Sequence, residues 1–330
     1  MGYAHKWLPP NFRVSNNLTS WRGNALDIHN QMIASGLEAT SDTGQLDIGS
    51  VAALPAYGSY AGYRIYQFSD GNALPILIKL EFTVGADTLN TDINYLGGGP
   101  SKNLFTRVTI GTATNGAGTF TSNTIQFSCP HGIMNGDNTS YETTSSIGSS
   151  FICYNESRGF FGIAYQVGGV RSGFTSYGTF VGSALTFMIQ RLYDSAGVPN
   201  SSGFMVLYPP QSAENSTAGW DNYSRAQSQI KVFRSDGSIS QPTLQQSRVT
   251  NHTSPSILGI DHPAAFNDMV SFDEMNCMAV TALNGLSPGQ TIGVQYGPGL
   301  TQTMVSIGRE TCHSFSSLLG QRHCALMLFE

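Results

Sequence analysis

Charged side chains are scarce in this 330-residue chain. Asp, Glu, Lys and Arg make up 11% of the residues, against roughly 25% in an average soluble protein. The net charge is −5, and the few lysines and arginines form no cluster. A protein that binds nucleic acid needs a basic stripe that displaces counterions from phosphates. We therefore expect no nucleic-acid partner.

Long apolar runs are also missing. No segment reaches the roughly 18 consecutive apolar residues of a membrane span. Residues 1–10 lack the hydrophobic region of a secretory signal peptide. We therefore expect no membrane partner, and we expect the chain to fold in a host cytoplasm before it assembles.

Cysteine is rare, and its spacing is irregular. The five cysteines form no regular framework, so in a cytoplasm we expect reduced thiols that fill small spaces in the core. The best metal candidate is a pair of Cys-His dipeptides near the C-terminus: Cys312, His313, His323 and Cys324. Thiolates and imidazoles bind zinc, but adjacent residues of a strand point to opposite faces. Cys129-Pro130-His131 has the same weakness, so we expect no metal and no cofactor.

Familiar catalytic motifs are absent from the sequence, including the Gly-x-Ser-x-Gly elbow, the Walker loop and His-Glu-x-x-His. Glycosidases use two carboxylates about 5–9 Å apart, a separation that sequence spacing does not establish. The densest acidic segment and its aromatic neighbours comprise Asp261, Phe266, Asp268, Phe272, Asp273 and Glu274. Phe266 and Phe272 could stack against a bound sugar or belong to the hydrophobic core, and the sequence favours neither interpretation. We name no catalytic residue and predict that the chain is not an enzyme.

Glycine is abundant, at 37 residues, and 40% of the residues are hydrophobic. Short segments with alternating apolar residues and glycine-rich turns between them predict antiparallel strands. The predicted strands are Tyr63–Phe68, Ile76–Val84, Leu104–Ile110, Phe120–Phe127, Phe151–Tyr154, Phe160–Val167, Ala184–Tyr193, Phe204–Tyr208, Gln229–Arg234, Cys277–Ala282, Met304–Ile307 and Ala325–Phe329. The fold class is therefore mainly β, an antiparallel sandwich or jelly-roll-like arrangement. Leu185–Tyr193 is expected at a sheet edge, where it pairs with a neighbouring subunit.

One amphipathic helix is predicted near the N-terminus. Its apolar residues recur at helical spacing: Trp21, Ala25, Ile28 and Met32. We expect Ser20 to cap its start and Gly36 to end it.

Residues 1–20 read as an arm, and Trp7 and Phe12 are expected to anchor it to a surface of its own chain or of a neighbour. We assign residues 1–40 to the arm and anchoring helix and residues 41–330 to a β-rich domain. That domain is either one unit or two sandwiches with a boundary near residues 195–230. Met134–Ser150 and Pro209–Arg225 are expected to be long loops, and Trp220 and Tyr223 in the second either make contacts or hold the loop to its own domain.

Several segments together resemble structural proteins of tailed-bacteriophage virions. The segments that carry the resemblance are Asp42–Asp47, Ala61–Asp70, Pro75–Phe82, Val108–Gly118, Phe160–Tyr165, Ile189–Arg191 and the C-terminal strand that ends in Glu330. None of them is a catalytic motif.

The resemblance implies a non-enzymatic structural subunit of a virion, in the tail or baseplate region, assembled in the host cytoplasm. Its implied partners are other virion proteins and copies of itself, as trimers or hexamers. Deletion of residues 1–20 is expected to block incorporation into particles. One alternative is a capsid decoration protein. Another is a receptor-binding or glycan-depolymerising tail module, in which Trp220, Tyr223 and residues 261–274 face a host-surface glycan.

Overall fold

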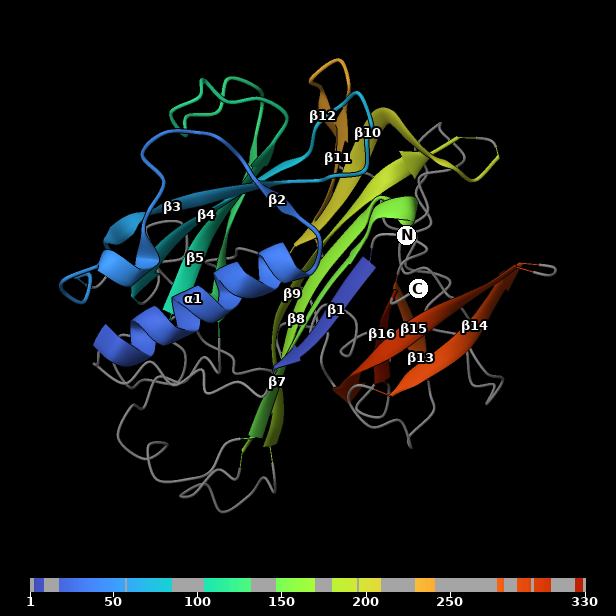
Figure 1. Cartoon of the computed structure of the whole chain (residues 1–330). Coiled ribbons are helices and arrows are strands. Elements are labelled where there is room, and N and C mark those ends of the chain that lie inside the picture. The colour runs from blue at the N-terminus through green and yellow to red at the C-terminus, as the bar shows by residue number, and fades with distance from the viewer. Residues whose placement is uncertain are drawn as a thin grey trace.

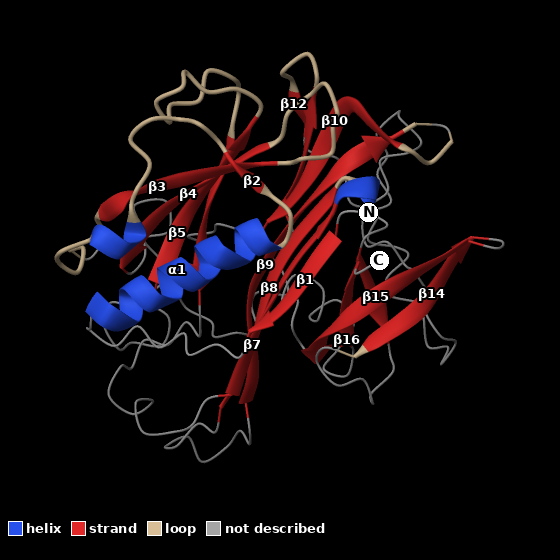
Figure 2. Ribbon diagram, viewed as in Figure 1, coloured by secondary structure: helices blue, strands red, loops and turns tan. Residues whose placement is uncertain are grey.

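A computed structural model describes twelve stretches of the chain, to which all structural statements below refer. They are residues 3–8, 18–56, 58–84, 104–131, 147–169, 180–194, 196–208, 229–240, 278–281, 290–297, 300–309 and 324–328. The described part is mainly β, with antiparallel sheets and one α-helix near the N-terminus, which confirms the prediction of a mainly β fold with one N-terminal helix (Figure 2). That helix lacks the length and apolar character needed to cross a membrane.

The helix α1 spans Leu18–Ala34. The predicted apolar stripe is confirmed, because Trp21, Ala25, Ile28 and Met32 are all fully buried. Ser20 lies inside the helix, so its predicted capping role is wrong. The arm therefore ends before Leu18, and a deletion through residue 20 would cut into the helix. Gly36, with φ +107°, follows the last turn as predicted, since this backbone region favours glycine.

A five-stranded antiparallel sheet follows the helix, and its strands neighbour one another in chain order. They are β2 (Glu38–Ala39), β3 (Tyr60–Gln67), β4 (Leu77–Val84), β5 (Leu104–Gly111) and β6 (Ile125–His131). The strand expected over Phe120–Phe127 begins late, since Phe120 forms only an isolated bridge with Thr114. The preceding residues belong to a loop between β5 and β6.

A seven-stranded antiparallel sheet has the order β1-β7-β8-β9-β10-β11-β12. Its strands are β1 (Tyr3–Leu8), β7 (Ile147–Asn155), β8 (Phe160–Gly169), β9 (Phe180–Tyr193), β10 (Pro199–Tyr208), β11 (Gln229–Arg234) and β12 (Ile239–Ser240). β7 and β8 form a hairpin, with the short 3-10 helix η2 (Glu156–Arg158) between them. A second 3-10 helix, η1 (Ile48–Ser50), precedes β3.

The expected edge position of Leu185–Tyr193 is wrong. These residues belong to β9, which lies between β8 and β10. Successive residues of β9 are buried, from Phe187 and Met188 to Ile189 and Gln190, so both faces of the strand are covered. A central strand has no free backbone edge to offer a neighbouring subunit.

A four-stranded sheet contains the C-terminal strands in the order β13-β16-β15-β14, a Greek-key arrangement. Its strands are β13 (Met278–Thr281), β14 (Thr291–Gly297), β15 (Leu300–Arg309) and β16 (Cys324–Leu328). Figure 1 shows this sheet on one side of the seven-stranded sheet, with the five-stranded sheet and α1 on the other. The sequence analysis missed β14, since glycines interrupt its apolar pattern.

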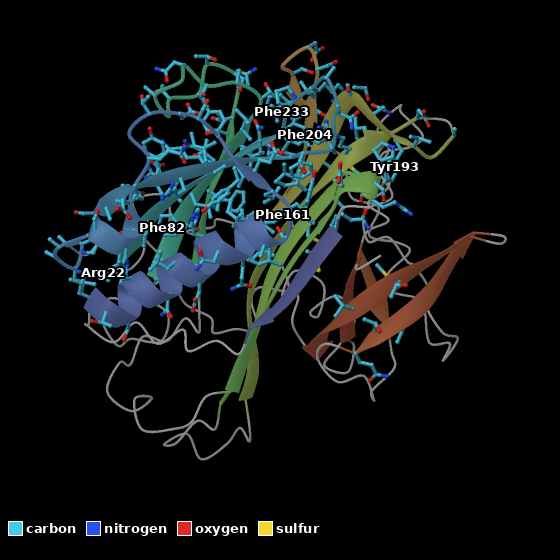
Figure 3. All side chains as sticks on the ribbon, viewed as in Figure 1. Arg22, Phe82, Phe161, Tyr193, Phe204 and Phe233 are labelled. Carbon is cyan, nitrogen blue, oxygen red and sulfur yellow. The ribbon has the colours of Figure 1, made fainter. Side chains whose placement is uncertain are left out.

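The five-stranded and seven-stranded sheets share one hydrophobic core with α1. Phe127 of β6 meets Phe187 of β9 edge to face, with ring centroids 5.2 Å apart. Phe204 of β10 stacks on Phe233 of β11 at 4.9 Å (Figure 3). β10 and β11 pair along Gly203–Tyr208 and Gln229–Arg234, so a domain boundary placed between these two strands would divide one sheet.

Candidate functional site

Two segments that carry the resemblance meet at one end of the five-stranded sheet. One is the loop that contains Asp42, and the other is the loop between β5 and β6. Asp42 Oδ1 accepts hydrogen bonds from Thr114 Oγ1 at 2.6 Å and from the Gly118 amide at 3.1 Å. The Thr43 amide donates to the Gly116 carbonyl at 2.8 Å. The two loops, more than 70 residues apart in sequence, therefore form one hydrogen-bonded unit, here called the Asp42 cluster.

The Asp42 cluster is also fixed to strand β3. Gln45 Nε2 donates to the Thr40 carbonyl at 2.7 Å, and Gln45 Oε1 accepts from the Ile65 amide at 2.9 Å. The Tyr63 hydroxyl donates to the Thr43 carbonyl at 2.6 Å. The Gln45 side chain thus accepts the hydrogen bond from the β3 backbone that a longer β2 would accept. This accounts for the Asp-Thr-Gly-Gln pattern as a folding element.

Glycine is required at position 118. Its φ is +78°, and a Cβ there would lie 2.2 Å from the Tyr63 ring. We expect Gly118→Ala to lower the free energy of unfolding by about 2–3 kcal/mol, the sum of backbone strain and overpacking. Gly116→Ala is the matched control, because φ is +77° there and a Cβ would meet nothing within 4 Å. Equal losses for the two variants in urea denaturation would contradict the role given to Tyr63.

The hydrogen bonds of Asp42 favour its ionised form. Burial raises the pKa of the carboxyl, but hydrogen bonds from Thr114, Thr40 and Gly118 outweigh burial, so the pKa lies below its ordinary value. A depressed pKa in the folded state stabilises the fold above the unfolded-state pKa, and this contribution disappears as the pH falls through the folded pKa.

We expect Asp42→Asn to lower the free energy of unfolding by about 1 kcal/mol at pH 7. The difference from the wild type should shrink as the pH falls below about 4, where the wild-type carboxyl takes up its proton. Urea denaturation at several pH values measures this. If the difference in the free energy of unfolding between wild type and variant stays constant from pH 7 to pH 3, the Asp42 carboxyl does not have a depressed pKa in the folded state.

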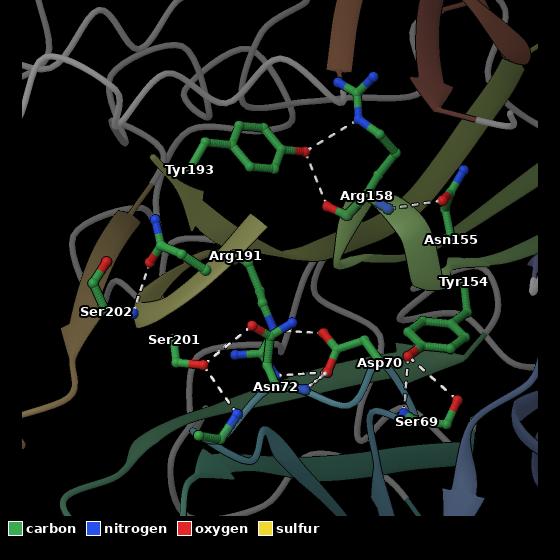
Figure 4. Close-up of polar contacts among 12 residues, drawn as sticks. Ser69, Asp70, Asn72, Tyr154, Asn155, Arg158, Arg191, Tyr193, Ser201 and Ser202 are labelled. Atoms are coloured by element: carbon green, nitrogen blue, oxygen red, sulfur yellow. Dashed lines mark hydrogen bonds and ion pairs between the residues drawn. The ribbon is translucent and has the colours of Figure 1, made fainter. Parts of the chain in front are cut away.

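A second polar cluster joins the two large sheets through a buried ion pair (Figure 4). Arg191 of β9 donates from Nε to Asp70 Oδ2 and from Nη2 to Asp70 Oδ1, the latter at 2.9 Å. The side chains of Arg191 and Asp70 are 0% and 2% exposed. Asp70 follows β3, so the pair connects the five-stranded sheet to the centre of the seven-stranded sheet. This bidentate geometry is the strongest form of the arginine–carboxylate contact.

Neighbouring contacts hold both partners of the ion pair in place. The Ser69 amide donates to the Tyr154 hydroxyl at 2.9 Å, and Ser201 Oγ donates to Asn72 Oδ1 at 3.1 Å. At Gly159, with φ +53°, a Cβ would lie 2.8 Å from Arg191 Cγ. The Tyr154 hydroxyl is protonated at neutral pH, and burial raises its pKa above the ordinary value. These contacts are suited to holding the five-stranded and seven-stranded sheets in one relative position.

Most of the candidate residues named from the sequence lie outside the described residues. These are Trp220, Tyr223, residues 261–274, Cys312, His313 and His323. Cys324 belongs to β16, and Cys129 and His131 belong to β6, with Pro130 between them. Within the described ranges, no three His, Cys, Asp or Glu side chains are grouped so that they could hold a metal ion. The expectations about these residues stay predictions.

No protein-family model, no curated protein and no solved structure matches this chain. The resemblance to tailed-phage virion proteins is therefore a prediction that rests on the sequence segments alone.

Proposed function

We propose that this chain is a non-enzymatic structural subunit of a tailed-phage virion, in the tail or baseplate region, that acts by assembling with copies of itself and with other virion proteins. One observation carries the proposal: the segments that resemble virion proteins contain the residues that link distant parts of the fold. Asp42 ties two distant loops together, and Asp70 ties β3 to Arg191 of β9. Such contacts suit a subunit that must keep one shape through repeated interfaces.

The surface of the Asp42 cluster supports an assembly role. Asn115, Gly116 and Ala117 are exposed and uncharged, and the Asn123 amide donates to the Gly237 carbonyl in the turn between β11 and β12. The exposed loop is therefore held to both large sheets. The rigid, uncharged tip of this loop can pack against a neighbour with little loss of side-chain freedom.

Quantitative immunoblotting of density-gradient-purified particles of the encoding phage tests the proposal. We expect the protein in intact particles, with a copy number that matches the ring-forming tail or baseplate proteins. A copy number that scales with the capsid protein would favour the decoration alternative. Absence from particles in a lysate that contains the free protein would contradict a virion role. Binding of the isolated protein to host cells would favour the receptor-binding alternative.

A further inference from the structure

Strand β1 is attached to its sheet differently from every other described strand of that sheet. From β7 to β12, neighbours follow one another along the chain. β1 instead pairs with a strand about 150 residues away, from Tyr3 opposite Asn155 to Leu8 opposite Ser150. It lies at the edge of the sheet, outside β7 (Figure 1). β1 therefore joins the edge of the sheet as a separate segment, and no hairpin connects it to its partner β7.

The edge of β7 that β1 covers requires a partner. Along Ser150–Asn155 this edge presents the backbone groups of a strand whose side chains include the buried Ile152, Cys153 and Tyr154. The unpaired N–H and C=O groups of an uncovered edge strand can pair with a strand of another chain. In an assembly of copies, the strand of matching sequence and register is Tyr3–Leu8 of the next copy.

Residues 9–17 join β1 to α1, and they begin with Pro9-Pro10. Nine residues can span up to about 30 Å when extended. By its length, a nine-residue segment permits pairing of β1 with the sheet of its own chain or with that of a copy whose β7 edge lies within this reach.

We propose that Tyr3–Leu8 of one copy pairs with β7 of a neighbouring copy in the assembled state, so that each subunit gives one strand and receives one. The backbone pairs are the same as those within a single chain, so the exchange costs little and concentration of the subunits favours it. Passed from each copy to the next, this heterologous contact closes a ring where the rotation between copies returns to the first subunit, and builds a filament where it does not. The inference rests on the proposed assembly of copies.

The register supplies a direct test, because His5 lies opposite the native Cys153. Directly opposite residues of an antiparallel pair have Cα atoms about 4.5–5.5 Å apart, within the range of a disulfide. The experiment uses the full-length His5→Cys variant at a concentration at which sedimentation shows the oligomer. Burial raises the pKa of the Cys153 thiol, so an added oxidant such as diamide is needed.

The expected result is a disulfide between position 5 of one chain and Cys153 of another. It should appear as covalent dimers and larger ladders on non-reducing gels, and peptide mapping should identify the linked residues. The matched control carries His5→Cys together with Cys153→Ala and should give no ladder. A monomeric band with an intrachain link, or no link at all, in a protein that sediments as an oligomer would overturn the exchange and leave the assembly proposal standing. A protein that sediments as a monomer at all concentrations would overturn both.

Deletion of residues 1–8 is the second variant, and it leaves α1 intact. Exchange predicts that this variant keeps its β-sheet circular dichroism and no longer forms the oligomer of defined size, since the contact that builds it is missing. An oligomer of unchanged size would contradict the exchange.

Discussion

Asp70→Ala is expected to lower the free energy of unfolding by about 3–5 kcal/mol, because it leaves the guanidinium of Arg191 buried without its counter-charge. Arg191 is fully buried, and Asp70 accepts two of its hydrogen bonds. Urea denaturation followed by circular dichroism measures the loss. Asp70→Ala combined with Arg191→Met should recover much of it, since the double change removes both charges.

A less buried ion pair, in the five-stranded sheet, provides the control. Lys79 Nζ lies 3.1 Å from Glu81 Oε1, and both side chains are partly open to solvent, at 15% and 20% exposure. We expect Glu81→Ala to cost less than about 1 kcal/mol, as is usual for surface ion pairs. If Asp70→Ala costs no more than Glu81→Ala, the ion pair does not hold the two sheets together.

Trp21→Ala is expected to lower the free energy of unfolding by about 3–5 kcal/mol, the cost of removing a large side chain from a packed core. Trp21 is fully buried, and its Nε1 donates to the Thr83 carbonyl at 3.2 Å. Ile33→Ala on the same helix is the control. Ile33 is 40% exposed, so its substitution should cost less than about 1 kcal/mol.

This comparison decides whether α1 is part of the fold or a separable anchor. The sequence analysis grouped the helix with the arm in residues 1–40, whereas its buried stripe lies in the core of the sheets. Similar small effects of Trp21→Ala and Ile33→Ala would mean that the helix can detach while the β-sheets stay folded.

Local patterns predicted the helix and many of the strands because side-chain periodicity reports which face of an element is buried. The pattern failed where this relation breaks down. β9 is buried on both faces along Phe187–Tyr193, so alternation gave no sign of its central position. β1 and β14 were missed, because β1 depends on a partner about 150 residues away and β14 is interrupted by glycine.

The candidate site was predicted only in part, for a related reason. The segments that contain Asp42, Asp70, Thr114 and Arg191 all stood out in the sequence, but which of these residues contact one another did not. The Asp70–Arg191 contact spans 121 residues, and the bond from Asp42 to Thr114 spans 72. Local spacing carries no information about contacts at this range, which depend on how the sheets pack. The sequence shows a glycine at position 118 but neither its positive φ nor its neighbour. The position of Tyr63 in the folded chain explains why no Cβ fits there.

Gold-labelled antibody against the purified protein, imaged on intact particles of the encoding phage, tests the central claim most directly. The account predicts label at the tail or baseplate. Label over the head would contradict the tail placement and favour a decoration protein. Absence of label from both intact and disrupted particles, with the free protein labelled in the same preparation, would contradict a structural role in the virion.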